Sequence, residues 1–156
     1  MSELTDWLHA QVLERKATAD KASQGPWQTR YLEEEDTDEA WAIIAPDQDV
    51  VGAGWEGGGV WLETDANHMV LNNPQDTIAR CEAELDILNE HYGVQAFLEG
   101  IAQKACRRCS DRIPDDMRLP GGNLWQAVEP SPCKTIRLLA SGYRHRPGYK
   151  AEEWAP

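Results

Sequence analysis

The stretch NPQDTIARCEAELDILNEH, residues 73–91, contains the strongest structural signal in the chain. Asn73 is suited to cap a helix, and Pro74 is suited to the first helical position. The apolar side chains that follow recur at steps of three, four and three residues, which places them on one face of that helix: Ile78, Cys81, Leu85 and Leu88. The stretch therefore predicts a long helix with one buried face that ends near His91.

The sequence before this helix predicts one further helix and a small sheet. Residues 1–24 carry apolar side chains at helical spacing, and Gly25-Pro26 ends the pattern. Between residues 27 and 63, short runs rich in aromatic and β-branched residues alternate with Asp, Pro and Gly. We expect a meander of three or four antiparallel strands in this part.

We expect helices over residues 64–105 as a whole. The last of them is a short helix after Gly93, because the apolar residues of that stretch follow helical spacing: Val94, Phe97, Leu98, Ile101 and Ala105. Residues 110–132 contain four Pro and two Gly, which predicts an irregular connection. A last helix is expected from Cys133 to about Gly142.

These elements predict an α+β fold in which a small antiparallel sheet packs with the N-terminal helix and the C-terminal helices. At 156 residues and 17.5 kDa, a single domain over residues 1–156 is the default expectation. No apolar run reaches the ~20 residues that cross a bilayer, and the first residues lack the pattern of a signal peptide. We therefore expect a cytoplasmic protein with no membrane partner.

Four cysteines suggest a metal site rather than disulfides, because the expected compartment is reducing. Cys106 and Cys109 form a C-x-x-C pair, and Cys133 opens the last predicted helix; this spacing is typical of thiolates that share one tetrahedral zinc ion. The fourth ligand is either His91 or Cys81. We expect a structural zinc that clasps residues 106–156, with spectator thiols or a redox pair as the alternatives.

Charge is distributed unevenly along the chain, whose formal net charge is −12. Residues 1–100 carry 21 acidic and 5 basic side chains, whereas residues 101–156 carry 6 and 10. The densest acidic run is either a solvated loop or a contact surface for a basic partner, and consists of Glu33, Glu34, Glu35, Asp36, Asp38 and Glu39. The basic residues that remain for binding nucleic acid or a nucleotide are Lys104, Arg107, Arg108, Arg112, Lys134, Arg137, Arg144, Arg146 and Lys150.

Signals for catalysis are weak. Residues 52–57 match G-x-G-x-x-G, but strand-like sequence follows where a dinucleotide site needs a helix, so we expect a glycine-rich hairpin. No catalytic triad or nucleophile–base pair is evident from spacing. We therefore expect no enzymatic activity.

The C-terminal string PCKTIRLLA, residues 132–140, is followed by Tyr143, Pro147-Gly148-Tyr149 and Glu153-Trp154. This pattern resembles an uncharacterised actinobacterial and actinobacteriophage family, the domain of unknown function 6221. Gly25-Pro26-Trp27, the Asp65-Ala66-x-His68 start and the helix ending at His91 also resemble that family, in the same order. Gly25-Pro26-Trp27, the Asp65 start and Asn73-Pro74 are similar as well to small phage accessory proteins of the lambda early Ea type.

In the resembled family a His at the end of the long helix precedes a C-x-x-C and the Cys of the PC motif. The resemblance therefore implies His91, Cys106, Cys109 and Cys133 as the zinc ligands, and a phage or actinobacterial origin with no known activity. Two departures are the extra helix expected between His91 and Cys106, and Ser110 where a Gly often follows the second Cys.

Two function hypotheses follow. The first is a non-enzymatic phage or prophage accessory protein with a structural zinc, which binds a host or phage macromolecule, in the first instance a protein. The alternative is a zinc-stabilised nucleic-acid or nucleotide-binding protein that uses the basic C-terminal third.

Overall fold

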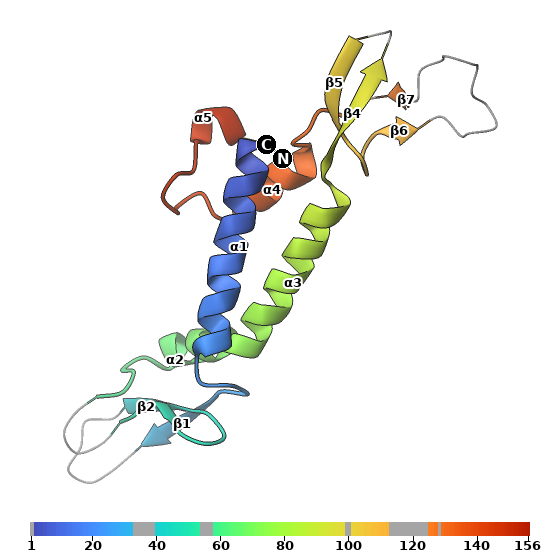
Figure 1. Cartoon of the computed structure of the whole chain (residues 1–156). Coiled ribbons are helices and arrows are strands. Elements are labelled where there is room, and N and C mark those ends of the chain that lie inside the picture. The colour runs from blue at the N-terminus through green and yellow to red at the C-terminus, as the bar shows by residue number, and fades with distance from the viewer. Residues whose placement is uncertain (1, 33–39, 54–57, 99–100, 113–124, 128) are drawn as a thin grey trace. The chain divides into compact units, whose positions relative to one another are not determined.

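The computed structural model describes residues 2–32, 40–53, 58–98, 101–112, 125–127 and 129–156 (Figure 1). These residues form two compact units: a terminal unit, Met1–Leu13 with Ala83–Pro156, and a middle unit, Glu14–Glu82. The single-domain interpretation remains a prediction. Within the described residues, no helix has both the length and the apolar character that crossing a membrane requires.

The middle unit contains the predicted antiparallel meander. Strands β1 (Gln28–Leu32), β2 (Ala40–Ile44) and β3 (Asp49–Val51) form one sheet in the order β1-β2-β3. Trp41 lies opposite Tyr31 in β1, with ring centroids 5.0 Å apart, and forms an isolated bridge with Val60 on its other side. The sequence thus correctly predicted the meander, and the fourth expected strand is reduced to the bridge at Val60.

Helix α2 (Glu63–Leu71) contacts β1 and β2. Ala66 of the helix and Ala42 of β2 are both fully buried, and small side chains such as these allow a helix and a sheet to approach closely. The glycine motif at residues 52–57 lies partly outside the described residues, at 54–57. Non-helical residues, including Gly58 and Gly59 at positive φ, separate the motif from α2.

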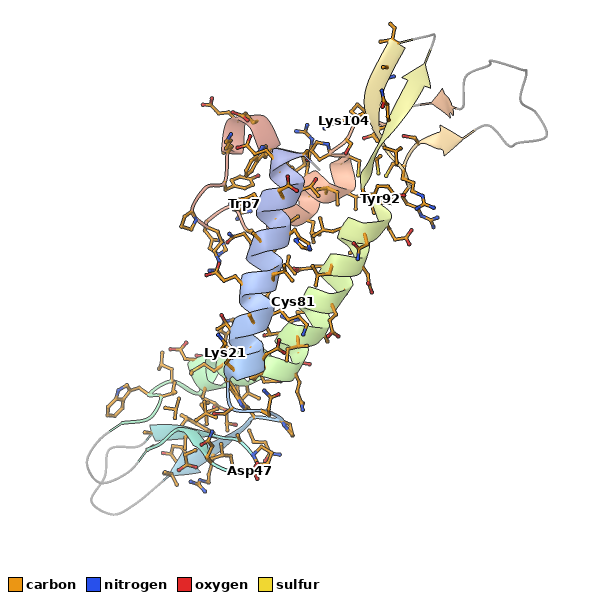
Figure 2. The ribbon with its side chains drawn as sticks, in the orientation of Figure 1. Trp7, Lys21, Asp47, Cys81, Tyr92 and Lys104 are labelled. Carbon is orange, nitrogen blue, oxygen red and sulfur yellow. The ribbon has the colours of Figure 1, made fainter. Side chains whose placement is uncertain are left out.

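Helix α3 (Pro74–Glu90) begins and ends where the sequence predicts. The Asp76 backbone N–H donates to Asn73 Oδ1 at 3.2 Å, so Asn73 caps the helix, and Asn73 Nδ2 donates to Asp76 Oδ2 at 2.6 Å, which holds the capping side chain in place. Cys81 is fully buried and Leu88 is almost so, as the apolar stripe requires. Figure 2 shows Cys81 midway along this helix.

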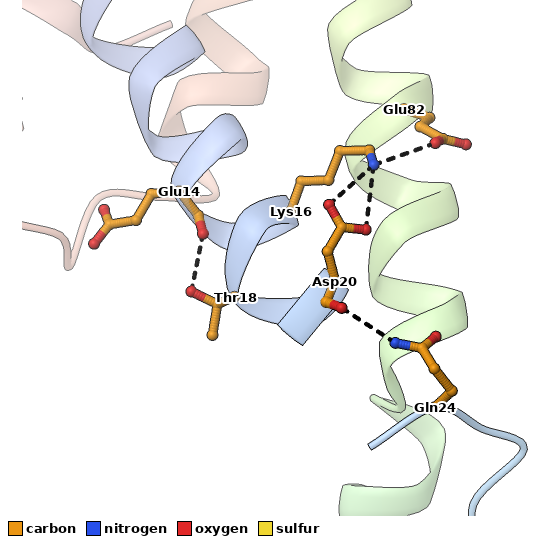
Figure 3. Close-up of polar contacts among 6 residues, drawn as sticks. All are labelled: Glu14, Lys16, Thr18, Asp20, Gln24 and Glu82. Carbon is orange, nitrogen blue, oxygen red and sulfur yellow. Dashed lines mark hydrogen bonds and ion pairs between the residues drawn. The ribbon is translucent and has the colours of Figure 1, made fainter. Parts of the chain in front are cut away.

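Helix α1 (Glu3–Lys21) confirms the predicted N-terminal helix. Its last turns lie in the middle unit, where Lys16 forms ion pairs with Asp20 at 3.3 Å and with Glu82 of α3 at 3.6 Å (Figure 3). Gln24 Nε2 donates to the Asp20 carbonyl at 3.4 Å beyond the end of the helix (Figure 3). Solvent screens these exposed ion pairs, so burial of apolar side chains carries more of the stability.

The helix expected between Val94 and Ala105 is wrong. These residues form an antiparallel hairpin of β4 (Gly93–Leu98) and β5 (Ile101–Cys106), with Gly93 opposite Cys106 and Leu98 opposite Ile101. Ala96 and Ala105 are buried, and half-buried Val94 packs against them. Val94 and Ala96 follow the two-residue period of a strand, although the same short run also fits the spacing of a helix. Tertiary packing and the β period decide the outcome.

The connection between Ser110 and Pro132 is partly regular. Strands β6 (Asp111–Arg112) and β7 (Trp125–Ala127) pair with each other, while residues 113–124 and 128 lie outside the described residues. The expectation of a wholly irregular segment is therefore corrected at its two ends.

The C-terminal part of the terminal unit consists of α4 (Lys134–Ser141), which confirms the predicted last helix, and the short α5 (Ala151–Trp154). Ile136 and Ala140 of α4 are fully buried, and the Tyr143 hydroxyl donates to Glu84 of α3. Trp7 of α1 packs against both Tyr149 and Trp154, with ring centroids 5.7 and 5.2 Å apart. The start of α1, the end of α3 and the C-terminal tail thus form one core.

Candidate metal centre

Four candidate ligand atoms from three separate segments converge in the terminal unit. His91 Nδ1 lies 3.5 Å from Cys106 Sγ, 3.3 Å from Cys109 Sγ and 3.5 Å from Cys133 Sγ. All four donor atoms lie within 4.8 Å of one another. The structure therefore brings three sulfurs and one imidazole nitrogen into a single cluster that could hold a metal ion.

These distances match the geometry of a tetrahedral zinc site. With Zn–N bonds of about 2.0–2.1 Å and Zn–S bonds of about 2.3 Å, tetrahedral angles place nitrogen and sulfur about 3.5 Å apart. A covalent disulfide, by contrast, requires sulfurs about 2.05 Å apart, and all four cysteines are free thiols in this structure. The cluster consequently has the dimensions of a metal site.

The β4–β5 hairpin is what brings Cys106 to His91. A helix over residues 94–105 would carry the chain about 18 Å along its axis before Cys106, whereas the hairpin returns Cys106 to a position opposite Gly93. Gly93 follows two residues after His91, at the end of α3. The extra residues between His91 and Cys106, by which this chain departs from the resembled family, therefore form a hairpin that begins and ends beside the cluster.

The hairpin base is tightly packed around Gly93. A Cβ atom at this position would lie 2.7 Å from Ser131 Oγ, closer than side chains tolerate, so only glycine fits without a shift. On the other side of β5, the Cys106 N–H donates to the Glu129 carbonyl at 2.8 Å and the Ser131 N–H donates to the Lys104 carbonyl at 3.1 Å. This pairing carries Cys133, two residues further along, toward the cluster.

The C-x-x-C segment forms a tight turn. The Ser110 N–H donates to the Cys106 carbonyl at 3.1 Å, which folds Cys109 back beside Cys106. Ser110 itself is buried, and its Oγ accepts from the Glu129 N–H at 3.0 Å. Ser110 therefore joins the turn to the segment that leads to Cys133, a contact that a glycine at this position would lack.

The thiols of the cluster need a cation to ionise together. Burial raises the pKa of the Cys106 thiol, the N–H groups of Cys109 and Arg108 lower it, and the Cys133 side chain raises it again. Partial burial, together with hydrogen bonds to Cys106 and Cys133, raises the pKa of the Cys109 thiol to about 12. In the ion-free protein these two sulfurs therefore keep their protons at neutral pH, and a bound metal ion would displace them.

Cys81, the alternative fourth ligand, is not part of this cluster. It lies in the middle unit as a fully buried side chain on the apolar stripe of α3. The structure thus groups His91 with the three other cysteines, as the family resemblance implies.

The candidate basic residues differ in their surroundings. Arg137 is engaged by the C-terminal tail: Nη1 donates to the carbonyls of Glu153 at 2.9 Å and Ala155 at 3.3 Å, and Nε donates to Pro132. Lys150 pairs with Glu3 at 2.6 Å. The Arg112 backbone lies in β6. The residues that remain exposed are Lys104, Arg107, Arg108, Lys134, Arg144 and Arg146.

Two features next to the cluster were not evident in the sequence. Arg107 Nη1 donates to the Tyr92 hydroxyl at 2.6 Å, and the guanidinium lies 5.2 Å from the Tyr92 ring centroid. A polar hollow of about 190 Å³ opens beside them, lined by Asn89, Glu90, Arg107 and Arg108. Figure 2 shows Tyr92 where α3 gives way to the hairpin. Only the position of Tyr92 directly after His91 could have indicated its proximity to the turn.

The acidic run predicted to bind a partner, Glu33–Glu39, lies outside the described residues. Its role therefore stays a prediction.

Comparison with known proteins places the chain in a family. No curated protein and no solved structure matches it. A family model described as a family of unknown function (DUF6221) matches residues 1–156, the whole chain. The protein is therefore a member of the DUF6221 family.

Proposed function

We propose that this protein is a non-enzymatic binding protein whose terminal unit is stabilised by one structural zinc ion. The observation that carries the proposal is the spacing of His91 Nδ1 from three sulfur atoms, 3.3–3.5 Å. The ligands would be His91, Cys106, Cys109 and Cys133.

Zinc is the metal that this donor set favours. Thiolate sulfur and imidazole nitrogen in a tetrahedral arrangement suit Zn²⁺, whereas Mg²⁺ and Ca²⁺ prefer six or more oxygen ligands. The N–H groups that donate to Cys106 would stabilise its thiolate form, which is a usual second layer of support around a zinc thiolate.

A structural role fits this site better than a catalytic one. Three thiolates and an imidazole supply all four ligands of a tetrahedral ion, so no position is left for a reacting water molecule. Cys106 and Cys133 are also buried, which limits access of a substrate to the ion. The zinc proposal therefore supports the expectation that the protein is not an enzyme.

The ion would join three segments that are distant in sequence. His91 follows α3, Cys106 ends β5, and Cys133 caps the N-terminus of α4. The chain between Cys109 and Cys133 contributes only the short strands β6 and β7 among its described residues. Zinc would thus hold the segment that ends at Cys133 to the end of α3 and to the hairpin.

Charge suggests the kind of partner. The middle unit, residues 14–82, carries 15 acidic and 5 basic side chains, including the run Glu33–Glu39. Such a surface repels nucleic acid and attracts basic proteins. In keeping with the resemblance to phage families, we propose a host or phage protein as the partner, and action in a bacterial cytoplasm.

A nucleic-acid or nucleotide-binding role is the second candidate, and the exposed Lys104, Arg108 and Lys134 near the cluster favour it. Salt dependence separates the two. Binding of a DNA or RNA duplex through these side chains would weaken steeply between 50 and 200 mM salt and would be lost on charge reversal at Arg108 and Lys134, by about 10²-fold or more. Neutralising Glu33–Glu39 would leave it intact.

The metal content of the purified full chain tests the zinc proposal. We expect about one zinc per chain in protein prepared without chelator. His91→Ala should weaken zinc binding by more than the roughly 100-fold that loss of an outer hydrogen-bond partner can cost, without abolishing it since three thiolates remain, while the matched control Cys81→Ala should keep full zinc. Less than about 0.2 zinc per chain, or full zinc in a Cys106→Ser, Cys109→Ser double variant, would contradict the proposal.

The binding proposal needs a separate experiment. Tagged full-length protein would be compared with a variant in which the six carboxylates of Glu33–Glu39 are converted to amides. A variant carrying Glu14→Gln and Asp47→Asn, two exposed acidic residues of the same unit, serves as control. We expect a basic protein to co-purify with the wild type and the control, but not with the amide variant. Equal recovery with all three would contradict a role for the acidic run.

A further inference from the structure

We propose that Cys109 is an oxidation site: a small hydroperoxide oxidises its sulfur, which then forms a disulfide with Cys106 and releases the bound ion. This chemistry presupposes the zinc site proposed above. It adds to that site a regulatory property that the four-ligand arrangement does not by itself require.

The three sulfurs of the cluster differ in access to solvent. Cys106 is 0% exposed and Cys133 is 1% exposed, whereas Cys109 is the exposed member of the cluster. A peroxide must reach sulfur directly, along the axis of its O–O bond, to react with it. Access therefore selects Cys109 as the first residue to be oxidised.

The contacts of the two sulfurs also favour Cys109 over Cys106 as the first to be oxidised. Besides its contact with His91 Nδ1, the Cys106 thiol donates to the His91 carbonyl at 3.7 Å, a partner that is not one of the four ligand atoms. The interactions of the Cys109 sulfur are with other members of the cluster, His91 Nδ1 at 3.3 Å and the two remaining thiols. On binding the ion, Cys109 would keep a lone pair directed to solvent, and a zinc-bound thiolate of this kind is a nucleophile.

A positive charge directly precedes the reacting residue in the chain. Arg108 is exposed and lines the hollow formed with Asn89, Glu90 and Arg107, so its side chain is free to reach an anion at Cys109. When a thiolate attacks a peroxide, the departing oxygen carries negative charge until it is protonated. The guanidinium of Arg108 would stabilise that charge.

Chain connectivity selects Cys106 as the disulfide partner. Cys106 and Cys109 belong to one turn, which the Ser110 N–H to Cys106 carbonyl hydrogen bond closes without help from the metal. Cys133 belongs to a different segment, at the start of α4. C-x-x-C pairs of this spacing form disulfides readily, so Cys106 is the expected partner of the oxidised Cys109.

The reaction balances with a peroxide as the only oxidant. In the first step the Cys109 thiolate attacks one peroxide oxygen, the O–O bond breaks, and the departing hydroxide takes a proton to become water, which leaves a sulfenic acid. In the second step the Cys106 thiolate attacks the Cys109 sulfur, and the sulfenic hydroxyl leaves as a second water after protonation. Two thiolates, one hydrogen peroxide and two protons thus give one disulfide and two waters.

Oxidation removes two of the four ligands, so His91 and Cys133 alone would hold the ion weakly. The expected consequence is release of Zn²⁺ and detachment of the N-terminus of α4 from the hairpin. Reduction by a thiol with zinc present would restore the site, because disulfides and sulfenic acids are reversible products.

The experiment uses the zinc-loaded full chain carrying Cys81→Ala, so that the cluster holds the only thiols. Hydrogen peroxide is added with a chromogenic zinc chelator, and peptide mass spectrometry follows each cysteine. We expect one zinc released per disulfide formed, a Cys106–Cys109 linkage, and recovery with dithiothreitol and zinc. Cys109→His, which offers a nitrogen ligand without a thiol, should hold zinc and release it at least about tenfold more slowly.

Either of two results would overturn the oxidation site while leaving the zinc proposal intact. One is modification of Cys106 or Cys133 before Cys109, and the other is an equal rate of zinc release from the wild type and Cys109→His. If Cys109→His fails to bind zinc, the order of alkylation of the zinc-loaded protein by N-ethylmaleimide decides instead, with Cys109 expected first. Absence of zinc from the untreated protein would contradict the proposed function itself, which the zinc measurement before peroxide addition detects.

Discussion

Helix α4 is attached to the rest of the terminal unit by different chemistry at its two ends. At its N-terminus, Cys133 meets His91, Cys106 and Cys109, a polar cluster that needs a cation to be stable with ionised thiols. Beyond its C-terminus, Tyr149 and Trp154 pack on Trp7, and Trp7 Nε1 donates to the Pro147 carbonyl at 3.0 Å. Under the two proposals above, the first attachment would depend on metal, pH and oxidants, whereas the second consists of ring packing and polar contacts that need no metal ion.

This contrast explains how the tail can stay in place while the cluster changes state. Gly148 adopts a φ of 85° and a Cβ there would lie 3.0 Å from Trp7 Nε1, so the turn before Tyr149 is fitted closely to α1. Among the described residues, the ring contacts and hydrogen bonds of Tyr149 and Trp154 with Trp7 and of Pro147 with Trp7 include no member of the cluster. Loss of the ion should therefore free one end of α4 and leave the other end anchored.

The largest expected effect comes from breaking the attachment at the N-terminus of α4, where Cys133 joins the cluster. Cys133→Ser should abolish stable zinc binding, lower the Tm by about 10 °C and open residues 110–132 to protease, because a structural metal contributes several kcal/mol of folding free energy. Calorimetry and limited proteolysis measure these changes. The matched control Cys81→Ala removes a buried sulfur outside the cluster and should cost only about 1–2 kcal/mol with zinc retained. Unchanged zinc content in Cys133→Ser would refute the attachment.

Breaking the attachment of the tail, in which Tyr149 and Trp154 pack on Trp7, should have a comparable cost in stability but no effect on the metal. Trp154 is 5% exposed, and Trp154→Ala should lower the free energy of unfolding by about 3 kcal/mol while zinc stays at one per chain. Trp61→Ala, at a tryptophan that is 62% exposed, should change stability by less than about 0.5 kcal/mol. Denaturant titration with metal analysis checks both variants. A loss of zinc in Trp154→Ala would show that the two attachments are coupled.

The dependence on pH should distinguish the two attachments further. In the ion-free protein the pKa values of Cys106 and Cys109 lie above their ordinary 9.0, the latter at about 12, so both sulfurs are protonated at neutral pH. This protonation favours the ion-free fold below pH 9, and its contribution is lost as the pH rises through about 12. Zinc affinity depends on pH in the opposite direction and rises with pH, because each of these thiols must release its proton to bind the ion.

Zinc affinity should consequently rise with pH by up to about a thousandfold per unit between pH 7 and 8, because each of the three cysteine ligands releases a proton when it binds the ion. Competition with a chelator of known pH dependence measures this slope. A slope below tenfold per unit would mean that the thiols are already ionised without metal.

Sequence patterns predicted those parts of the protein whose signals are local. The Asn73 cap, the stripe through Cys81 and Leu88, and the meander around Trp41 each depend on neighbouring residues, and each was found as expected. The segment from Gly93 to Cys106 was not, because Val94, Phe97 and Ile101 satisfy helical spacing while Val94 and Ala96 also alternate. The register of the hairpin, in which Leu98 pairs with Ile101, is set by contacts between the two strands.

The composition of the candidate site was predictable, but its assembly was not. Cys106, Cys109 and Cys133 were identified from spacing, and His91 from the family resemblance. How His91 meets Cys106 depends on the hairpin register and on the pairing of Ser131 with Lys104, which are contacts between residues far apart in sequence. No period or motif in one segment encodes such a contact, and the misassigned helix would have separated the two ligands.

The smallest expected effect concerns Arg137, which touches both attachments. Its Nε donates to the Pro132 carbonyl at 3.2 Å, next to Cys133, and its Nη1 donates to the carbonyls of Glu153 and Ala155. Arg137→Ala should cost about 1–2 kcal/mol, because hydrogen bonds from a charged donor are lost at a partly exposed site. Hydrogen exchange should increase in residues 151–156, whereas zinc content should stay unchanged since Arg137 is not a ligand. Arg137→Lys retains the charge without the planar group, so it should restore less than half of the loss if geometry matters more than charge. Faster zinc release from Arg137→Ala would instead show that this side chain transmits strain between the tail and the cluster.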